Sequence, residues 1–243
     1  MQLAHATWLE VEAYLERSDG IILPVGATEQ HGPIGLIGTE TICAEEIATR
    51  AGEQSGALVA PALGWTPAPF NMLFPGTISI SVELFSALVT QIVDGLTSQG
   101  FRRVYVVNGH GANLEPLHRI AEGRPGMRIR SWWDFAEVNA IRRELYGDWE
   151  GMHATPSEVA ITQATRRRVH HPMADEPPRP IDAAFVKAHA GDRHGPPDAH
   201  RATFPDGRVG SHSALATPEA GLKLLAAAVH AVSQDYSAFV VSV

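Results

Sequence analysis

The sequence predicts an α/β protein in which helices cover a mostly parallel sheet. Short apolar runs alternate with longer amphipathic stretches, an order typical of parallel strands connected by helices. The apolar run at residues 20–26 indicates a buried strand. Carboxylate and imidazole side chains follow this run directly, and active sites of open α/β sheets lie outside the carboxyl ends of the strands.

Each element is predicted from a local pattern. Helix 82–99 carries one apolar stripe, because leucine or isoleucine recurs every four residues from Leu84 to Leu96, and Gly100 then ends it. Thr155 and Pro156 indicate the N-cap and first position of another helix. The expected strands cover 20–26, 57–62, 102–108 and 127–133, and the expected helices cover 7–17, 40–54, 82–99, 113–122, 135–146, 156–168 and 218–235.

The composition indicates an ordinary globular protein. Of 243 residues, 44% are hydrophobic and 19% charged, which suits a single domain over residues 1–243. The net charge of -8, with no basic run beyond 166–168, argues against a nucleic-acid partner.

The sequence also bears on compartment. The single cysteine, Cys43, excludes an internal disulfide framework, and its apolar surroundings predict a buried, inert thiol. The N-terminus shows no secretory signal, and no run of 18 apolar residues predicts a membrane span. We therefore expect a cytoplasmic protein that does not bind a membrane.

The segment 170–215 is the least regular part of the chain. It is rich in proline, glycine and histidine, and its runs at 176–180 and 194–197 are too proline-rich for a helix. Such a segment usually lines a site, contacts a partner or is disordered. A surface loop is the simplest interpretation, and an intersubunit arm is an alternative in which His189, Asp192, His194 and His200 reach a neighbouring site.

The most informative motif follows the strand at 20–26. Glu29, His31 and Glu40 place two carboxylates and an imidazole within twelve residues, and Gly32 with the following proline lets the chain turn sharply. Carboxylate oxygens and imidazole nitrogens suit Zn²⁺, Mn²⁺ or Fe²⁺. We interpret this motif as part of a metal site.

Two further motifs supply ligand-type side chains. His110 stands between glycines after the strand at 102–108, where it can approach a ligand closely or face solvent from a glycine-rich turn. His153 and Glu158 flank a predicted helix start, where Glu158 can also serve as a helix-capping acid. Trp149 would otherwise be a plain packing residue.

Together these side chains could hold two divalent metal ions. Zinc is the first expectation, with manganese or iron as alternatives, and a hydroxide bridging two metals forms at neutral pH. A Ser-His-Asp hydrolase is disfavoured because no Gly-x-Ser-x-Gly occurs, and 109–111 lacks the later glycine and the lysine of a nucleotide-binding loop.

The motifs at 24–33, 38–41, 108–113 and 153–158 resemble the creatininase (creatinine amidohydrolase) family, in its order and roughly its spacing. The resemblance implies a three-layer α/β/α fold, a dinuclear zinc or manganese/zinc site, and a homo-oligomer, often a hexamer built from dimers. It implies that Glu29 and His110 hold one metal, that His31 holds the other, and that Glu40 bridges them. The substrate would be a small molecule.

The sequence departs from true creatininases at several positions. Glu40 stands where the family usually has aspartate, and Gly111 and Ala112 stand where creatininases carry a tyrosine and a metal-binding glutamate. The resemblance implies that Glu158 replaces the missing carboxylate. It also implies that Trp149, Glu150 and His153 contact substrate, as does the backbone at Gly111.

The function that we expect is hydrolysis of a C–N bond, in an amide, cyclic amide or formamide, by the bridging hydroxide. His153 would donate or relay the proton to the leaving nitrogen, with Glu150 as the second catalytic residue. The wider family also includes deformylases, a hydrolase of a cyclic inositol-derived ketone, and a peptidase. Two alternatives stay open: a degenerate homologue that binds a metabolite or partner without catalysis, and hydrolysis of C–C or ester bonds on the same metals.

Overall fold

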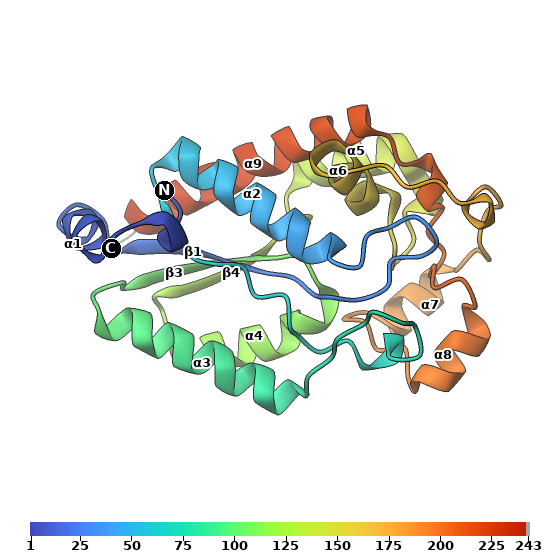
Figure 1. The fold of residues 1–243 in the computed structure, drawn as a ribbon, viewed down its shortest axis with the longest axis horizontal. Helices are drawn as coiled ribbons and strands as arrows, with labels where there is room; N and C mark the ends of the chain where they lie inside the picture. Colours follow the sequence, from blue (N-terminus) through green and yellow to red (C-terminus); the bar gives the residue numbers. More distant parts are fainter. Residues whose placement is uncertain (242–243) are drawn as a thin grey trace.

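A parallel four-stranded sheet forms the centre of the computed structural model, which describes residues 1–241. The last two residues of the expected 1–243 domain lie outside the described part. The strands are β1 (Gly20–Val25), β2 (Leu58–Val59), β3 (Arg103–Asn108) and β4 (Met127–Ser131), in the order β2-β1-β3-β4. Every pairing is parallel, so the carboxyl ends of β1, β3 and β4 meet at one edge (Figure 1).

Helices cover both faces of this sheet and produce the expected three layers (Figure 1). One face packs against α2 (Thr39–Ser55), α5 (Ala136–Tyr146), α6 (Pro156–Thr165) and α9 (Pro218–Val241). The other face packs against α3 (Val82–Ser98) and α4 (Leu114–Ala121), and α1 (Trp8–Leu15) lies near the N-terminus. All strands and helices expected from the sequence are present, with ends that differ by a few residues.

Alternation along the strands divides the core into two halves. Ile22 and Tyr105 face α2 and α9, whereas Ile21, Leu23 and Val104 face α3 and α4. Successive side chains of a strand point to opposite faces of the sheet. Because helices cover both faces, most residues of each strand are apolar. The two core clusters lie on opposite faces of the sheet. They hold the strands in place and thereby fix the positions of the strand ends.

The helix boundaries follow the signals in the sequence. Thr155 caps α6 by accepting from the backbone N–H of Glu158, and the Glu158 carboxylate accepts from the Thr155 N–H in return. Gly100 follows α3 with φ +110°, a conformation that glycine adopts without the penalty of a Cβ. Cys43 is buried inside α2, as expected.

Helix α9 is long and apolar enough to meet the length and composition test for a membrane span. Half of its most apolar window is buried in this structure, where Leu224, Ala228 and Val232 join the core beside α2 and α6. Its apolar character is therefore used in packing within the chain.

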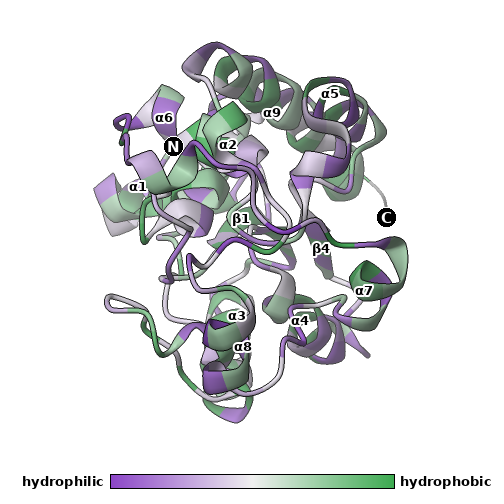
Figure 2. Cartoon of the chain, turned by 90° about the vertical axis from the view of Figure 1, so that its right-hand side faces the viewer, coloured by the Kyte–Doolittle hydropathy of each residue, from purple (hydrophilic) through white to green (hydrophobic). Residues whose placement is uncertain are grey.

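The segment 170–215 is more ordered than its composition predicts. It contains two short helices, α7 (Ala183–Ala188) and α8 (Pro197–Thr203), which lie beyond the carboxyl edge of the sheet (Figure 1). The run at 194–197 does lead into a helix, because Pro197 occupies the first helical position, where its missing N–H costs nothing. Figure 2 views this edge of the molecule and shows the predominantly hydrophobic character of α7.

Candidate metal centre

Carboxylates and imidazoles from separate parts of the chain meet at the carboxyl edge of the sheet. The loop after β1 contributes Glu29 and His31, the first turn of α2 contributes Glu40, and His110 follows β3. The start of α6 contributes Glu158, with His153 just before it. These six side chains are buried, with exposed fractions of 0% for Glu29 and His110, 1% for His31, 2% for His153, 5% for Glu40 and 6% for Glu158.

Two glycines allow the start of α2 to approach the strand ends. A Cβ on Gly109 would lie 2.5 Å from the backbone carbonyl oxygen of Glu40. A Cβ on Gly26 would overlap the backbone N of Thr41. Because both neighbours are backbone atoms, neither can move aside without moving α2. These glycines therefore bring Glu40 within reach of His110.

Backbone carbonyls fix the tautomers of the three imidazoles. One ring nitrogen of each lies against a carbonyl oxygen: His31 Nδ1 at 3.1 Å from Glu29, His110 Nε2 at 2.8 Å from Pro67, and His153 Nε2 at 2.7 Å from Gln30. A carbonyl oxygen only accepts hydrogen bonds, so these nitrogens carry the hydrogen. The other nitrogen of each ring faces the cluster, where it can bind a metal ion when it carries no hydrogen.

The second ring nitrogens of His110 and His31 lie near carboxylate oxygens. His110 Nδ1 lies 2.9 Å from Glu40 Oε1 and 3.5 Å from Glu29 Oε1. His31 Nε2 lies 3.7 Å from Glu158 Oε1 and 3.9 Å from the same Glu40 oxygen. The ligand atoms thus form two adjacent groups that share Glu40.

The unsatisfied atoms of this cluster fit a divalent cation. Glu29 Oε1, Glu40 Oε2 and His31 Nε2 are buried and have no hydrogen-bond partner within the described residues 1–241. Ligand atoms of Glu29, His31, Glu40 and His153 all lie within 4.8 Å of one another. Two ligands at about 2.1 Å from a tetrahedral zinc ion are separated by roughly 3.4 Å, close to most of these distances. Nitrogen and carboxylate donors in this number suit zinc, manganese or iron.

The electrostatics of the cluster also favour a cation. Burial raises the pKa values of Glu29 and Glu40 well above that of an ordinary glutamate, and neighbouring carboxylates raise both pKa values further. Burial likewise raises the pKa of Glu158 to about 8. Buried carboxylates repel one another when they are ionised, and bound divalent ions remove that penalty.

His153 lies inside the cluster. Its Nδ1 is 3.5 Å from Glu29 Oε1, and burial together with the neighbouring His31 lowers its pKa well below the ordinary value. The following Ala154 has φ +58°, an uncommon conformation for a residue with a Cβ. His153 is therefore neutral near pH 7, with Nδ1 available to accept a proton or bind a metal.

A cavity of about 180 Å³ opens onto the cluster. Its wall includes Glu40, Glu158 and Gly111, together with Trp132, Trp133, Arg142, Met152 and Asp192. A cavity of this volume suits a small molecule. Its indole and guanidinium groups offer both an apolar and a polar surface.

Trp149 and Glu150, which the sequence predicts to contact substrate, are not among the described residues that line this cavity. The Trp149 ring packs against His212 with centroids 5.7 Å apart. Glu150 Oε1 accepts from Arg142 Nε at 3.0 Å and from the Ser157 hydroxyl. Glu150 thus holds the Arg142 side chain. Gly111 lies in the wall of the cavity.

Several residues of the site were not assigned to it from the sequence, although Asp192 was considered as a residue that reaches a neighbouring subunit's site. Asn71 donates to Glu29 Oε2 at 2.7 Å from the 3-10 helix η2 (Pro69–Asn71). Trp132 and Trp133 line the cavity directly after β4, at the carboxyl edge of the sheet. Their place at the end of a predicted strand was the one feature of the sequence that indicated this position. Asp192 comes from the irregular segment, and its Oδ2 lies 3.6 Å from His110 Nδ1. The positions of Asn71 and Asp192 depend on how the loops that carry them fold over the site.

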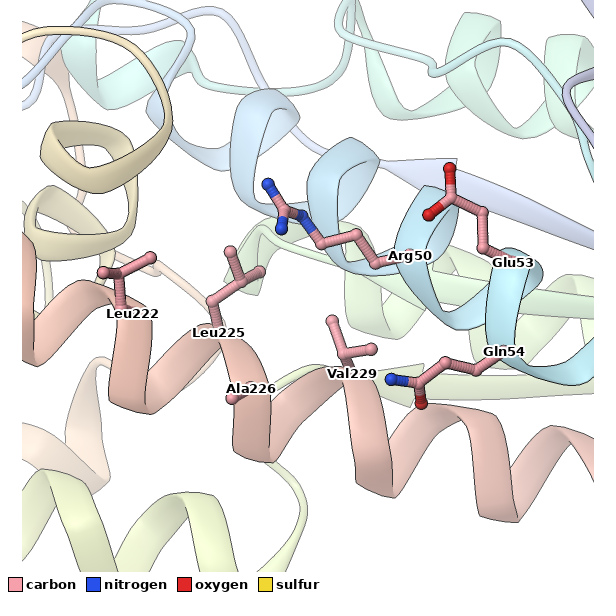
Figure 3. Close-up of a pocket in the computed structure, with 7 residues that line it drawn as sticks. All are labelled: Arg50, Glu53, Gln54, Leu222, Leu225, Ala226 and Val229. Carbon is pink, nitrogen blue, oxygen red and sulfur yellow. The ribbon is translucent and has the colours of Figure 1, made fainter.

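A larger hollow lies between α2 and α9, away from the cluster (Figure 3). Its lining includes Arg50, Glu53 and Leu222. Arg50 stands ten residues beyond Glu40 on the same helix, or about 15 Å along its axis. This hollow carries no cluster of ligand-type side chains and is separate from the candidate centre.

The fold and the cluster define an α/β protein with a buried carboxylate–imidazole metal site at the carboxyl edge of a parallel sheet. A family model described as creatininase, creatinine amidohydrolase, matches residues 4–235. The chain belongs to the creatininase family of metal-dependent hydrolases.

Comparison with curated relatives shows how far the similarity extends. Creatinine amidohydrolase of Pseudomonas putida is 29% identical over 75% of this chain and 82% of its own. A 3-dehydro-scyllo-inosose hydrolase of Thermotoga maritima is 31% identical over 62% of this chain and 49% of its own. A mycofactocin precursor peptide peptidase of Mycolicibacterium smegmatis is 36% identical over 40% of this chain and 41% of its own.

Solved structures agree with the fold. A crystal structure of creatininase superposes with a TM-score of 0.77 at 24% identity, covering 100% of this chain and 98% of the other. Structures described as "Creatininase Mn" and as a mutant creatininase of "Zn-Zn type" give TM-scores of 0.74 and 0.73 at 25% identity, each over 96% of both chains.

Proposed function

We propose that this protein is an amidohydrolase that cleaves a C–N bond of a small polar molecule with two divalent metal ions. The observation that carries the proposal is the pair of ligand groups sharing Glu40 beneath a small cavity, with three buried ligand atoms unsatisfied. Glu29, His110 and Glu40 would hold one ion, and His31, Glu158 and Glu40 the other. When bound, such ions lower the pKa of a water molecule and polarise a carbonyl group.

The side chains around the ions have separate tasks in this proposal. Asn71 fixes the second oxygen of Glu29, and the Pro67 and Glu29 carbonyls hold the His110 and His31 rings in one tautomer. His153 accepts a proton at Nδ1 and returns it to the leaving nitrogen, because its ring is neutral and its Nε2 hydrogen is already committed to Gln30.

The cavity supports a small, partly polar substrate. Trp132 and Trp133 provide flat apolar surfaces, and Arg142 adds donors whose direction is set by Glu150 and by Asn139, which accepts at 2.9 Å. In this proposal Glu150 acts through Arg142. The 29% identity to a creatinine amidohydrolase over most of both chains supports an amide substrate.

A second candidate is hydrolysis of a bond other than an amide, because a relative at 31% identity is named a hydrolase of 3-dehydro-scyllo-inosose. A substrate panel separates the two. Zinc-loaded and manganese-loaded protein would be assayed against cyclic amides (creatinine included), formamides, short peptides, cyclic ketones, lactones and linear esters. We expect turnover of at least one C–N substrate, which His153→Gln reduces strongly. Turnover of only esters, lactones or ketones would overturn the amide assignment.

The panel also distinguishes a homologue without catalysis. Fewer than one equivalent of metal after growth with zinc and manganese, together with no turnover, would contradict the enzyme proposal. We further propose, from the resemblance alone, that the chain forms a homo-oligomer in the cytoplasm. A monomeric elution volume at micromolar concentration would contradict the assembly.

A further inference from the structure

Asp192 reaches the candidate centre from a loop between two helices of the segment 170–215. Its Oδ2 lies 3.6 Å from His110 Nδ1, on the same ring nitrogen that faces Glu29 at 3.5 Å. The Asp192 side chain is only 10% exposed. Its other oxygen, Oδ1, lies 3.5 Å from His194 Nε2. The backbone of Ala112 also donates to this carboxylate, and a nearby cation would compensate its buried charge further.

The backbone of the loop is shaped to direct Asp192 inward. Asp192 has φ +55° and follows Gly191 at φ +74°, and the N–H of His194 donates to the Asp192 carbonyl at 3.0 Å. A left-handed conformation at a non-glycine residue is uncommon and is tolerated best by asparagine and aspartate. The turn is therefore suited to the residue type that it presents to the cluster.

Stacked rings hold the loop in position over the site. His189 stacks on Phe185 of α7 with centroids 3.8 Å apart, and His194 stacks on His189 at 5.5 Å. His194 also packs against Phe70 at 4.8 Å, and Phe70 contacts His153 at 5.7 Å. The loop is thus tied through aromatic contacts to the wall of the centre itself.

Gly111 leaves the space that the Asp192 carboxylate occupies. A Cβ on Gly111 would overlap Asp192 Oδ2 and lie 2.9 Å from its Cγ. Any side chain at position 111 would therefore displace Asp192 from His110. Gly111, which has no side chain, and the inward turn at Asp192 are therefore complementary in shape.

We propose that Asp192 is a ligand of the metal ion held by Glu29, Glu40 and His110. That ion would then have three carboxylate ligands and one imidazole ligand. The second ion, held by His31, Glu158 and Glu40, would have no ligand from Asp192. This inference rests on the proposed function, because it assumes that the cluster binds metal.

The test compares zinc binding by the purified, metal-stripped full chain and by Asp192→Asn. Asparagine keeps the left-handed backbone and the shape of the side chain and removes only the charge. Titration with Zn²⁺ alone against a chromophoric chelator should give two equivalents for the unmodified protein. In Asp192→Asn, we expect one of the two sites to weaken by at least about tenfold and the other to stay within a factor of two.

Two further variants separate metal binding from loop structure. Gly111→Ala should weaken the same site, because its Cβ displaces the carboxylate that Asp192→Asn neutralises. Asp198→Asn, on the exposed face of α8, is the matched control and should bind zinc like the unmodified protein. Equal affinities of the unmodified protein and Asp192→Asn at both sites would overturn the inference and leave the proposed function intact. Absence of zinc binding by the unmodified protein would instead contradict the proposed function.

Discussion

His31 Nε2 lies 3.7 Å from Glu158 Oε1, although these residues come from opposite ends of the site motifs. The same Glu158 oxygen accepts the Thr155 N–H at 2.6 Å and completes the cap of α6. The sequence left capping and metal binding as alternatives for this residue, and the geometry accommodates both. The cap holds the carboxylate in one rotamer and therefore directs it toward His31.

Removal of one imidazole should remove one metal ion. His31→Ala deletes the nitrogen that faces Glu158, and His110→Ala deletes the one that faces Glu29 and Glu40. We expect each variant to retain about one equivalent of metal by elemental analysis and to lose at least about 99% of turnover, since removing one metal-ligating group disables the shared centre. His118→Ala, on the exposed surface of α4, is a control with unchanged metal content. Full metal content in both site variants would contradict the ligand assignment.

Shortening Glu40 should weaken the shared position. Glu40→Asp withdraws the carboxylate by one C–C bond, about 1.5 Å, and α2 cannot follow because its start already contacts Gly26 and Gly109. We expect metal content at limiting zinc to fall from two equivalents toward one. Glu53→Asp, on an exposed turn of the same helix, should behave like the unmodified protein. Two tightly bound equivalents in Glu40→Asp would show instead that the centre adapts to the shorter side chain.

The elements of the fold were predictable because their signals are local. Helix 82–99, for example, has an apolar stripe and a glycine stop, and the structure places α3 at 82–98. The stripe is not the buried face, however, because Leu84 and Leu88 are exposed and Phe85, Val89 and Val93 enter the core instead. The short helices α7 and α8 were missed, because six- and seven-residue helices carry too few turns to produce a periodic pattern.

The residues of the site fall into two groups, those that the sequence could place and those that it could not. Glu29, Glu40 and His110 follow strand ends or begin the next helix, so parallel topology alone brings them to one edge. Asn71 and Asp192 arrive through loops, whose course depends on tertiary contacts such as the ring stack at His194. No spacing rule in the sequence encodes those contacts, although the histidine-rich composition of 170–215 did mark the segment.

The metal-free protein should lose stability as pH rises from 6.5 to 8. Glu158 has a folded pKa of about 8 against 4.5 ordinarily, so its stabilising contribution is complete below pH 4.5 and is lost as pH rises through 8. Glu29 and Glu40 share this direction. His31 acts oppositely, because its pKa of about 4 lies below 6.5 and its contribution is lost only as pH falls through that range. Above pH 6.5 the carboxyls alone determine the slope.

Thermal unfolding of the metal-stripped protein measures this slope. Each carboxyl contributes up to about 1.4 kcal/mol per pH unit, and 1 kcal/mol corresponds to roughly 2–4 °C in a domain of this size. We expect Tm to fall by several degrees between pH 6.5 and 8, and less in Glu158→Gln. Saturating zinc should abolish the fall, since bound metal keeps the carboxylates ionised. A metal-free Tm that stays level or rises over this range would contradict the assigned pKa directions.

Gly109 should be intolerant of a single added methyl group. A Cβ there would lie 2.5 Å from the Glu40 carbonyl oxygen and 3.5 Å from the Cβ of Ala44, so β3 and α2 must separate. Overpacking of this kind costs about 1–3 kcal/mol, which corresponds to a Tm lower by roughly 2–12 °C for Gly109→Ala. The same displacement moves His110 from Glu40, so zinc affinity should fall with stability.

Gly95→Ala is the matched comparison for that substitution. Gly95 lies within α3, and a Cβ there meets nothing within 4 Å, so alanine should raise stability by about 0.5–1 kcal/mol through its helix preference. Zinc affinity should not change, because α3 lies on the far side of the sheet from α2. If Gly109→Ala melted at the temperature of the unmodified protein and bound zinc equally well, the close approach of α2 to β3 would not be what positions Glu40 against His110.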